Sequence, residues 1–153
     1  MPRRAVEEPM ESWASSPAVR RVMRGNRKRD TGPELALRRA IHRLGLRYRV
    51  AARPLRDRPW TADLVFPRAR VAVFMDGCYW HGCPEHYEAP QTNASYWGPK
   101  IQRNQARDRL VDAELIEAGW RPLRIWEHAE LSDATARVLV AVGRMSGGEV
   151  PQR

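Results

Sequence analysis

The chain has 153 residues, of which 42% are hydrophobic and 29% are charged, and this length is ordinary for one domain. These values exclude wholesale disorder, because a folded chain of this size buries roughly two thirds of its unfolded surface. Lysine and arginine outnumber aspartate and glutamate by 27 to 18, and the net charge of +9 favours a polyanionic partner such as nucleic acid. Nearly all the basic residues are arginine, so codon bias is the alternative explanation of the charge.

The two ends of the chain lack hydrophobic periodicity. We therefore expect residues 1–18 to be a flexible leader, residues 19–145 a single domain and residues 146–153 a flexible tail. No run approaches the roughly 18 apolar residues of a membrane span, and the N-terminus has no signal-peptide core, so we expect a cytoplasmic protein. Six basic residues and no acidic one lie between Arg20 and Arg29. This run is typical of an arm that follows phosphates, or alternatively of a solvated, unstructured segment.

The first predicted elements are a helix and a hairpin. Thr31 and Glu34 have the spacing of a capping box at the start of a helix that runs to about residue 44. Residues 61–66 and 71–75 are short apolar runs joined by a turn, which predicts two antiparallel strands. The apolar face of the helix is expected to comprise Leu37, Ile41 and Leu44.

The second half of the chain predicts an irregular loop, a long helix, a strand and a last helix. Their expected ranges are 77–96, 99–118, 121–127 and 133–144. A strand that follows a long helix can pair parallel to an earlier strand through a right-handed crossover. The order of elements thus predicts a small α/β fold with a central mixed sheet flanked by helices.

A cluster of cysteine and histidine follows the predicted hairpin. Cys78, Cys83 and His86 lie within nine positions, and thiolate and imidazole are ligands that Zn²⁺ prefers. A closed structural site needs a fourth ligand, for which His81 and His128 are the candidates, and spacing favours His128. The alternative is two buried reduced cysteines beside ordinary histidines.

Two aspartates mark a second candidate metal site. Asp63 interrupts an apolar strand, where a carboxylate is costly to bury unless it is paired or binds a cation, and Asp76 ends the next strand. Carboxylates and a backbone carbonyl are suitable ligands for Mg²⁺ beside a phosphodiester. His81 has the chemistry of a base that activates water, and Asp108 could fix its tautomer. The alternative role for Asp63 is a buried ion pair with an arginine.

These residues together resemble the very-short-patch-repair (Vsr-type) DNA mismatch endonucleases, over about residues 19–130. The resemblance implies a restriction-endonuclease-like fold and Mg²⁺-dependent nicking of the T-bearing strand, 5′ to the T of a T:G mismatch left by deamination of 5-methylcytosine. The segments that carry it are Asp63 in its strand, residues 73–84 (VFMDGCYWHGCP), Tyr96-Trp97, Asn104 to Asp108, and Gly119-Trp120 through His128.

The resemblance also implies roles for single positions. Asp63 matches the metal-binding aspartate, His81 the catalytic histidine and Asp108 its support, whereas Glu34 matches a glutamate near the active site or is simply the helix cap. Aromatic wedges inserted beside the mismatch are expected, since unstacking costs least there. The expected DNA contacts are Met23, Arg24, Lys28, Tyr79, Trp80, Trp97 and Lys100.

Two departures from the family pattern stand out. Met75 and Asp76 replace the expected Thr-His before Gly-Cys, so Met75 would offer its carbonyl to Mg²⁺ and Asp76 could add a second carboxylate. The zinc ligands are rearranged to two thiolates and two imidazoles, with His128 in place of a final cysteine.

We therefore predict a monomeric, nucleoid-associated mismatch endonuclease with catalytic Mg²⁺ and structural Zn²⁺. Its expected partners are double-stranded DNA with a T:G mismatch and, as candidates, mismatch-repair proteins. The alternatives are a restriction-type nuclease of the same fold with another specificity, and a non-catalytic, zinc-stabilised DNA-binding module.

Overall fold

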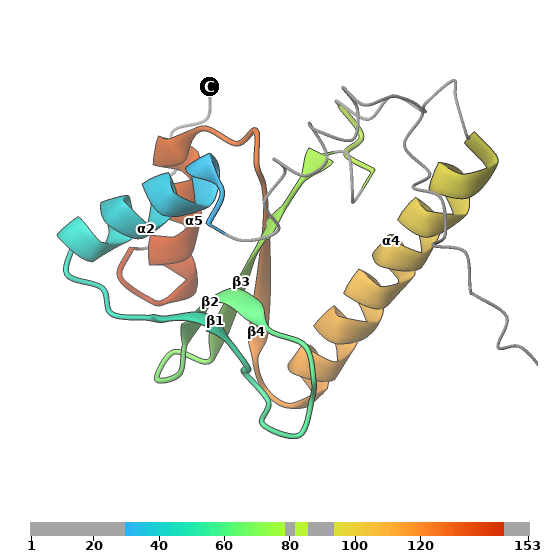
Figure 1. Ribbon diagram of the computed structural model, residues 1–153. Helices are drawn as coiled ribbons and strands as arrows, with labels where there is room; N and C mark the ends of the chain where they lie inside the picture. The colour runs from blue at the N-terminus through green and yellow to red at the C-terminus, as the bar shows by residue number, and fades with distance from the viewer. Residues whose placement is uncertain (1–29, 79–81, 86–93, 146–153) are drawn as a thin grey trace, which may run out of the picture.

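The computed structural model describes residues 30–78, 82–85 and 94–145, leaving aside the side chains of Ala94, Tyr96 and Trp97. In these residues, a four-stranded sheet of order β1-β2-β3-β4 separates three helices (Figure 1). The strands are β1 (Arg49–Ala52), β2 (Ala62–Phe66), β3 (Val71–Asp76) and β4 (Arg121–Trp126), and the helices are α2 (Gly32–Arg43), α4 (Ala94–Glu117) and α5 (Leu131–Ala141).

The sheet is mixed, as the sequence predicts. β1 pairs antiparallel with β2, β2 pairs antiparallel with β3, and β3 pairs parallel with β4. The long helix α4 forms the crossover between the two parallel strands. Because β3 and β4 are parallel, the residues that follow them, Gly77 and Glu127 onward, leave the same edge of the sheet.

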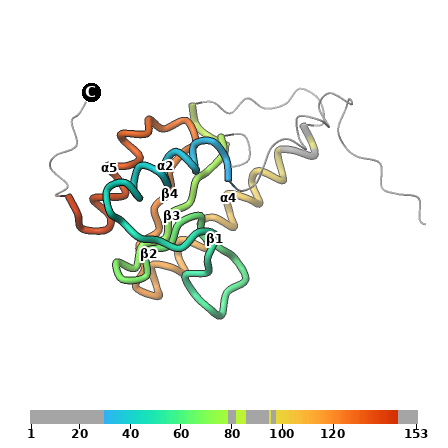
Figure 2. Tube along the Cα trace, turned by 60° about the vertical axis from the view of Figure 1, so that its left-hand side comes forward, coloured from blue at the N-terminus to red at the C-terminus, as the bar shows by residue number. Residues whose placement is uncertain are grey.

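Two apolar layers cover the two faces of the sheet. On one face, α2 and α5 pack through Leu37, Ile41 and Val138 against β2, β3 and β4. On the other, α4 contributes Val111 and Leu115, which contact the face of β3 that carries Ala72 and Phe74. Figure 2 shows the beginning of α4 projecting beyond the sheet, and the α4 residues of this apolar layer, Val111 and Leu115, lie in its second half.

The end of α2 corrects one prediction about the core. Leu44, expected on the apolar face, is 54% exposed, and Leu46 is buried in its place. Gly45 has a φ of +84°, and the amide of Leu46 donates to the carbonyl of Ile41. This Schellman turn reverses the chain and directs the next apolar residue into the core.

Three further differences concern the ends of elements. Thr31 makes no side-chain capping hydrogen bond, so that half of the predicted capping box is wrong. α4 begins at Ala94 rather than at Pro99, so Pro99 lies inside the helix, where it has no amide to donate to the carbonyl four residues earlier. β1 was not predicted, since its four partly exposed residues show no alternation of apolar and polar side chains.

None of the described helices is long and apolar enough to cross a membrane.

Candidate active site and metal centre

Asp63 lies in β2 and points its carboxylate at the neighbouring strand. Its Oδ2 accepts a hydrogen bond of 2.7 Å from the backbone amide of Met75 in β3. Burial is the main cause that raises the pKa of Asp63 to about 6, and the nearby carboxylates of Glu34 and Asp76 raise it further. The Met75 amide and Arg38 act in the opposite direction. Within the described part of the chain, Asp63 forms no ion pair, so the buried-pair alternative is not supported.

Glu34 brings a second carboxylate to the same place from the first turn of α2. Its side chain is only 2% exposed and forms an ion pair with Arg38, one turn further along the helix. Arg38 also reaches Asp30 at 2.8 Å. Glu34 is therefore held by a cation and buried toward Asp63, which is a different role from that of a solvent-exposed helix cap.

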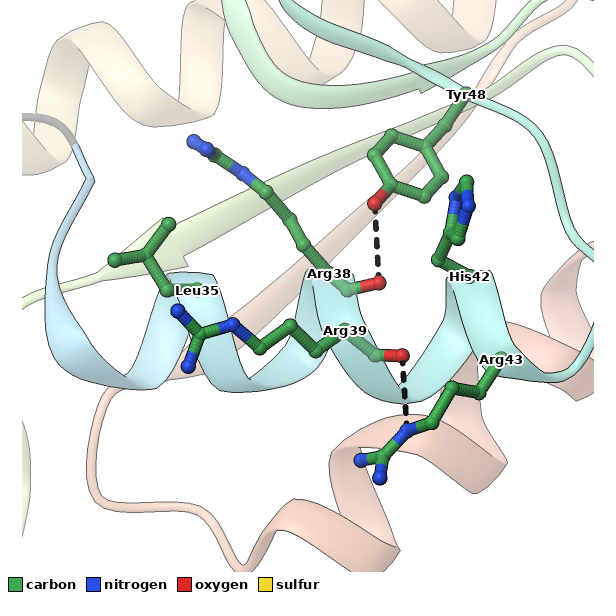
Figure 3. Close-up of a pocket in the computed structure, with 6 residues that line it drawn as sticks. All are labelled: Leu35, Arg38, Arg39, His42, Arg43 and Tyr48. Atoms are coloured by element: carbon green, nitrogen blue, oxygen red, sulfur yellow. Dashed lines mark hydrogen bonds between the residues drawn. The ribbon is translucent and has the colours of Figure 1, made fainter.

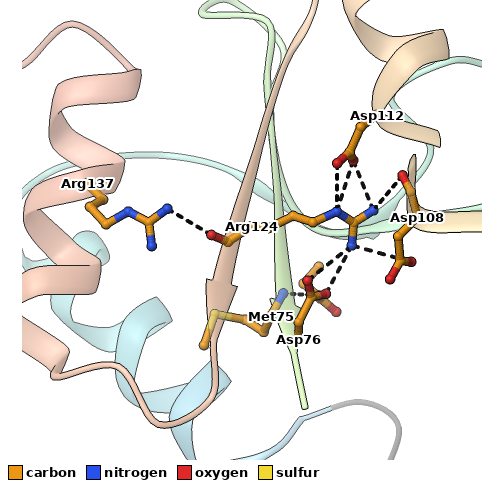
Figure 4. Close-up of polar contacts among 7 residues, drawn as sticks. Met75, Asp76, Asp108, Asp112, Arg124 and Arg137 are labelled. Atoms are coloured by element: carbon orange, nitrogen blue, oxygen red, sulfur yellow. Dashed lines mark hydrogen bonds and ion pairs between the residues drawn. The ribbon is translucent and has the colours of Figure 1, made fainter. Parts of the chain in front are cut away.

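Asp76 ends β3 and supplies the third carboxylate. It is 5% exposed, and both its oxygens accept hydrogen bonds from Nη1 of Arg124, at 3.0 and 3.3 Å (Figure 4). The same nitrogen lies 3.5 Å from Oδ1 of Asp108, on α4. The predicted acidic residues of β2, β3, α2 and α4 thus converge on one region.

The zinc ligands predicted within the described residues also come together. Sγ of Cys78 lies 3.0 Å from Nδ1 of His128, and Sγ of Cys83 lies 3.7 Å from the same nitrogen. These three donor atoms all lie within 4.8 Å of one another. A tetrahedral Zn²⁺ bound by sulfur and nitrogen places such atoms about 3.6 Å apart, so this donor set fits the ion.

Backbone contacts hold this cluster at the edge of the sheet. The amide of Cys83 donates to the carbonyl of Cys78 at 2.9 Å, which closes the loop, and Oε1 of Glu127 accepts from the amide of Cys78 at 3.0 Å. Burial is the main cause that raises the pKa of the Cys78 thiol to about 11, and the neighbouring Cys83 adds to it. A bound cation would reverse this effect, since it deprotonates coordinating thiols.

The other nitrogen of His128 faces an acidic side chain. Nε2 lies 3.6 Å from Oε2 of Glu85, in the loop that carries Cys83. A carboxylate on the outer nitrogen fixes the tautomer that leaves Nδ1 for a metal. The residues present are therefore suited to a structural zinc centre, whose predicted ligand His86 lies outside the described residues.

A separate surface hollow lies on the outer side of α2. It has a volume of about 670 Å³ and is lined by arginines, a histidine and Tyr48, whose hydroxyl donates to the carbonyl of Arg38 (Figure 3). None of the acidic or metal-ligating residues described above lines it. The hollow adjoins the carboxylate cluster through Arg38, which lines it and pairs with Glu34.

Among the predicted DNA contacts, Lys100 lies near the start of α4 and is partly buried. The structure does not describe several other predicted site residues. Those outside the described residues are Met23, Arg24, Lys28, Tyr79, Trp80, His81 and His86, together with the side chain of Trp97.

Sequence reasoning missed Arg38 and Arg124, the two cations that hold the acidic residues. Arg124 had a detectable signal, because it is a charged residue between the apolar residues Leu123 and Ile125 of a strand. That is the same signal that identified Asp63. Arg38 carried no such signal, since arginine is common on helix surfaces.

The chain is similar to known DNA endonucleases. The family model described as DNA mismatch endonuclease Vsr matches residues 15–87. The type II nicking enzyme V.NaeI of Lentzea aerocolonigenes is 47% identical over 138 residues, which cover 84% of this chain and 78% of that protein. The type II nicking enzyme V.XorIIP of Xanthomonas oryzae pv. oryzae is 41% identical over 123 residues, covering 79% and 88%.

A more distant relative carries the name of the family itself. The DNA mismatch endonuclease Vsr of Escherichia coli is 37% identical over 108 residues, which cover 70% of this chain and 67% of that protein. The matches span most of the described sheet and helices. The chain therefore belongs to the Vsr family of DNA mismatch endonucleases.

Proposed function

We propose that this protein is a DNA endonuclease that nicks the T-bearing strand 5′ to the T of a T:G mismatch. The observation that carries the proposal is the Asp63 carboxylate, held on the Met75 amide beside Glu34 and Asp76 with its pKa raised to about 6. A cluster of acidic groups at a basic protein's sheet edge is suited to a divalent cation and a phosphodiester. The family supplies the class of reaction.

The carboxylate cluster fits a catalytic Mg²⁺. Asp63 would be its main ligand, with the carbonyl of Met75 beside it, and Asp76 is a further candidate despite its contact with Arg124. When bound, the ion would polarise the phosphodiester and lower the pKa of water. Glu34, held by Arg38, would keep the region acidic and help to orient water.

His81 is proposed as the base that accepts the proton of the attacking water, with Asp108 fixing its tautomer. Support comes from the position of Asp108, whose carboxylate lies on the inner side of α4 close to Asp76 and Arg124. His81 follows Cys78 by three residues, so a zinc centre at Cys78, Cys83, His86 and His128 would restrain its segment.

The basic arm and the aromatic residues are proposed to contact the duplex. Met23, Arg24 and Lys28 would approach from one groove, and Tyr79, Trp80 and Trp97 would insert beside the mismatch, with Lys100 on a phosphate. We further propose that the protein acts as a monomer, since a T:G mismatch is an asymmetric target.

A second candidate function has its own support. The two relatives with 47% and 41% identity are both named type II nicking enzymes, and the second candidate is therefore nicking set by sequence context rather than by the mismatch alone. A set of labelled duplexes distinguishes the candidates: one T:G pair in varied flanking sequences, the other mismatches, and the matched duplexes, each with Mg²⁺ present or withheld.

We expect one cut strand, 5′ to the T, in T:G duplexes with Mg²⁺, and none with the Asp63→Asn variant. Equal nicking of matched and T:G duplexes would indicate that the protein recognises sequence context rather than the mismatch. Cuts in both strands would indicate a restriction-type nuclease. Binding without any cutting would leave only a DNA-binding module.

A further inference from the structure

Arg124 occupies an unusual position for a charged residue, in the middle of β4, the last strand of the described sheet, which pairs in parallel with β3. It lies on β4 directly beside Phe74 of β3, in the parallel register that also pairs Asp76 with Trp126. Its neighbours Leu123 and Ile125 face the core under α2 and α5. Because side chains alternate along a strand, Arg124 faces α4, as Phe74 does.

All three guanidinium nitrogens of Arg124 have acidic or carbonyl partners (Figure 4). Nε lies 3.0 Å from each carboxylate oxygen of Asp112, and Nη2 lies 3.0 Å from Oδ1 of the same residue. Nη1 contacts Asp76 at 3.0 Å and Asp108 at 3.5 Å. Nη2 also donates to the backbone carbonyl of Asp108 at 3.3 Å.

Two further contacts hold Arg124, one at its guanidinium and one at its backbone. Its central carbon lies 4.4 Å from the centre of the Phe74 ring, and the backbone carbonyl of Arg124 accepts a hydrogen bond of 2.9 Å from Arg137 of α5. Burial lowers the pKa of Arg124, but the three aspartates outweigh this and raise it, so the side chain stays charged. A planar fork with this many fixed partners has little freedom to move.

These contacts connect two proposed active-site residues, Asp76 and Asp108, through the guanidinium of Arg124. Asp76 sits at the end of β3 and Asp108 on α4, and the structure shows Arg124 between them, with Asp112 one helical turn further on holding the guanidinium. The contact to the Asp108 carbonyl fixes the helix backbone as well as the side chain.

We propose that Arg124 is a positioning residue for strand nicking, which sets the distance between the Asp76 end of β3 and Asp108 on α4. This inference rests on the proposed function, in which both aspartates serve the reaction. Arg124 acts through them and touches neither DNA nor the reacting atoms. Geometry of this kind matters because a displacement of about 1 Å in a catalytic group can reduce a rate by about 100-fold.

Three variants test the proposal. Arg124→Gln removes the charge and the fork, Arg124→Lys keeps the charge without the fork, and Asp112→Asn leaves Arg124 in place but weakens its anchor. Arg121→Gln is the matched control, because Arg121 lies on the same strand and donates from an exposed position to the carbonyl of Ala141.

The measurements separate positioning from folding. Single-turnover nicking is followed at saturating enzyme on a duplex that the wild type cuts, and the rate is expressed per folded, zinc-containing molecule. DNA affinity is measured by fluorescence anisotropy with Ca²⁺ in place of Mg²⁺, and the folded fraction by circular dichroism.

We expect the rate to fall about 100-fold in Arg124→Gln, at least 10-fold in Arg124→Lys and about 5-fold in Asp112→Asn. The Kd for DNA should change less than about threefold, and the control should nick like the wild type. If Arg124→Gln does not fold, the two milder variants decide. Folded Arg124→Lys and Asp112→Asn proteins that nick within twofold of the wild type would overturn the proposal. A wild-type protein that shows no preference for T:G duplexes would instead refute the proposed function.

Discussion

Replacing Asp63 with asparagine is expected to stabilise the protein at neutral pH while it abolishes nicking. The carboxylate is partly buried beside Glu34 and Asp76, and its pKa is raised to about 6. The charged form therefore disfavours the folded state. An asparagine side chain has nearly the same shape and keeps an oxygen that can accept the 2.7 Å hydrogen bond from the Met75 amide.

The magnitude follows from the two pKa values. The pKa of Asp63 is ordinarily 3.8 and is about 6 in the folded state, so the native state binds more protons than the unfolded state between these values. Stability therefore falls as the pH rises through this window, and the penalty is complete above it. It amounts to about 1 kcal/mol at pH 4.5 and about 3 kcal/mol at pH 8, and the variant should gain these amounts.

Urea unfolding of both proteins at the two pH values, without added magnesium, measures this difference. A comparison of variant with wild type cancels the titration of the carboxylates that do not interact with Asp63. Asp57→Asn is the control, since that side chain is 76% exposed and its replacement should change stability by less than about 0.5 kcal/mol at either pH. A gain at Asp63 that is the same at pH 4.5 and pH 8, or a loss of stability at pH 8, would refute the reasoning.

Three further predictions concern the metal centre and the packing around it. Cys83→Ser should reduce bound zinc, measured by mass spectrometry, from about one ion per chain to nearly none, and zinc retained at full occupancy would contradict the ligand set. Gly82→Ala should lower the free energy of unfolding, measured with urea, by about 1 kcal/mol or more, because Gly82 has a φ of +63° and the new Cβ would lie 2.7 Å from Nε2 of Gln105; no loss would refute this. Leu115→Ala should cost about 2 to 5 kcal/mol of unfolding free energy because the side chain is fully buried, whereas Leu110→Ala on the exposed side of α4 should cost much less, and equal costs would contradict the packing.

The sequence predicted those parts of the fold that depend on local pattern. The hairpin of β2 and β3, the crossover helix and the parallel strand β4 are all confirmed, because apolar runs and turn residues mark them directly. The edge strand β1 and the burial of Leu46 were missed, since both depend on pairing or turning against residues distant from the local pattern.

The same distinction applies to the site. Asp63 could be found from the cost of a carboxylate in an apolar strand, and Cys78, Cys83 and His128 from their ligand chemistry. The link from Arg124 to Asp76 and Asp108 could not be found, because it joins β3, β4 and α4 and needs the strand register to be known.

The parallel pairing of β3 with β4 also determines the order in which the chain can assemble. Cys78 and His128 are 50 residues apart in the sequence, so their meeting closes a loop that contains all of α4, whereas the turn between β2 and β3 is short. Loop-closure entropy rises with loop length, and long-range pairings form late in folding. We therefore expect the hairpin to form before β4 docks. A chain in which β4 has not docked offers zinc Cys78, Cys83 and the predicted ligand His86 without His128, so the full four-ligand site forms only in molecules that have completed the sheet.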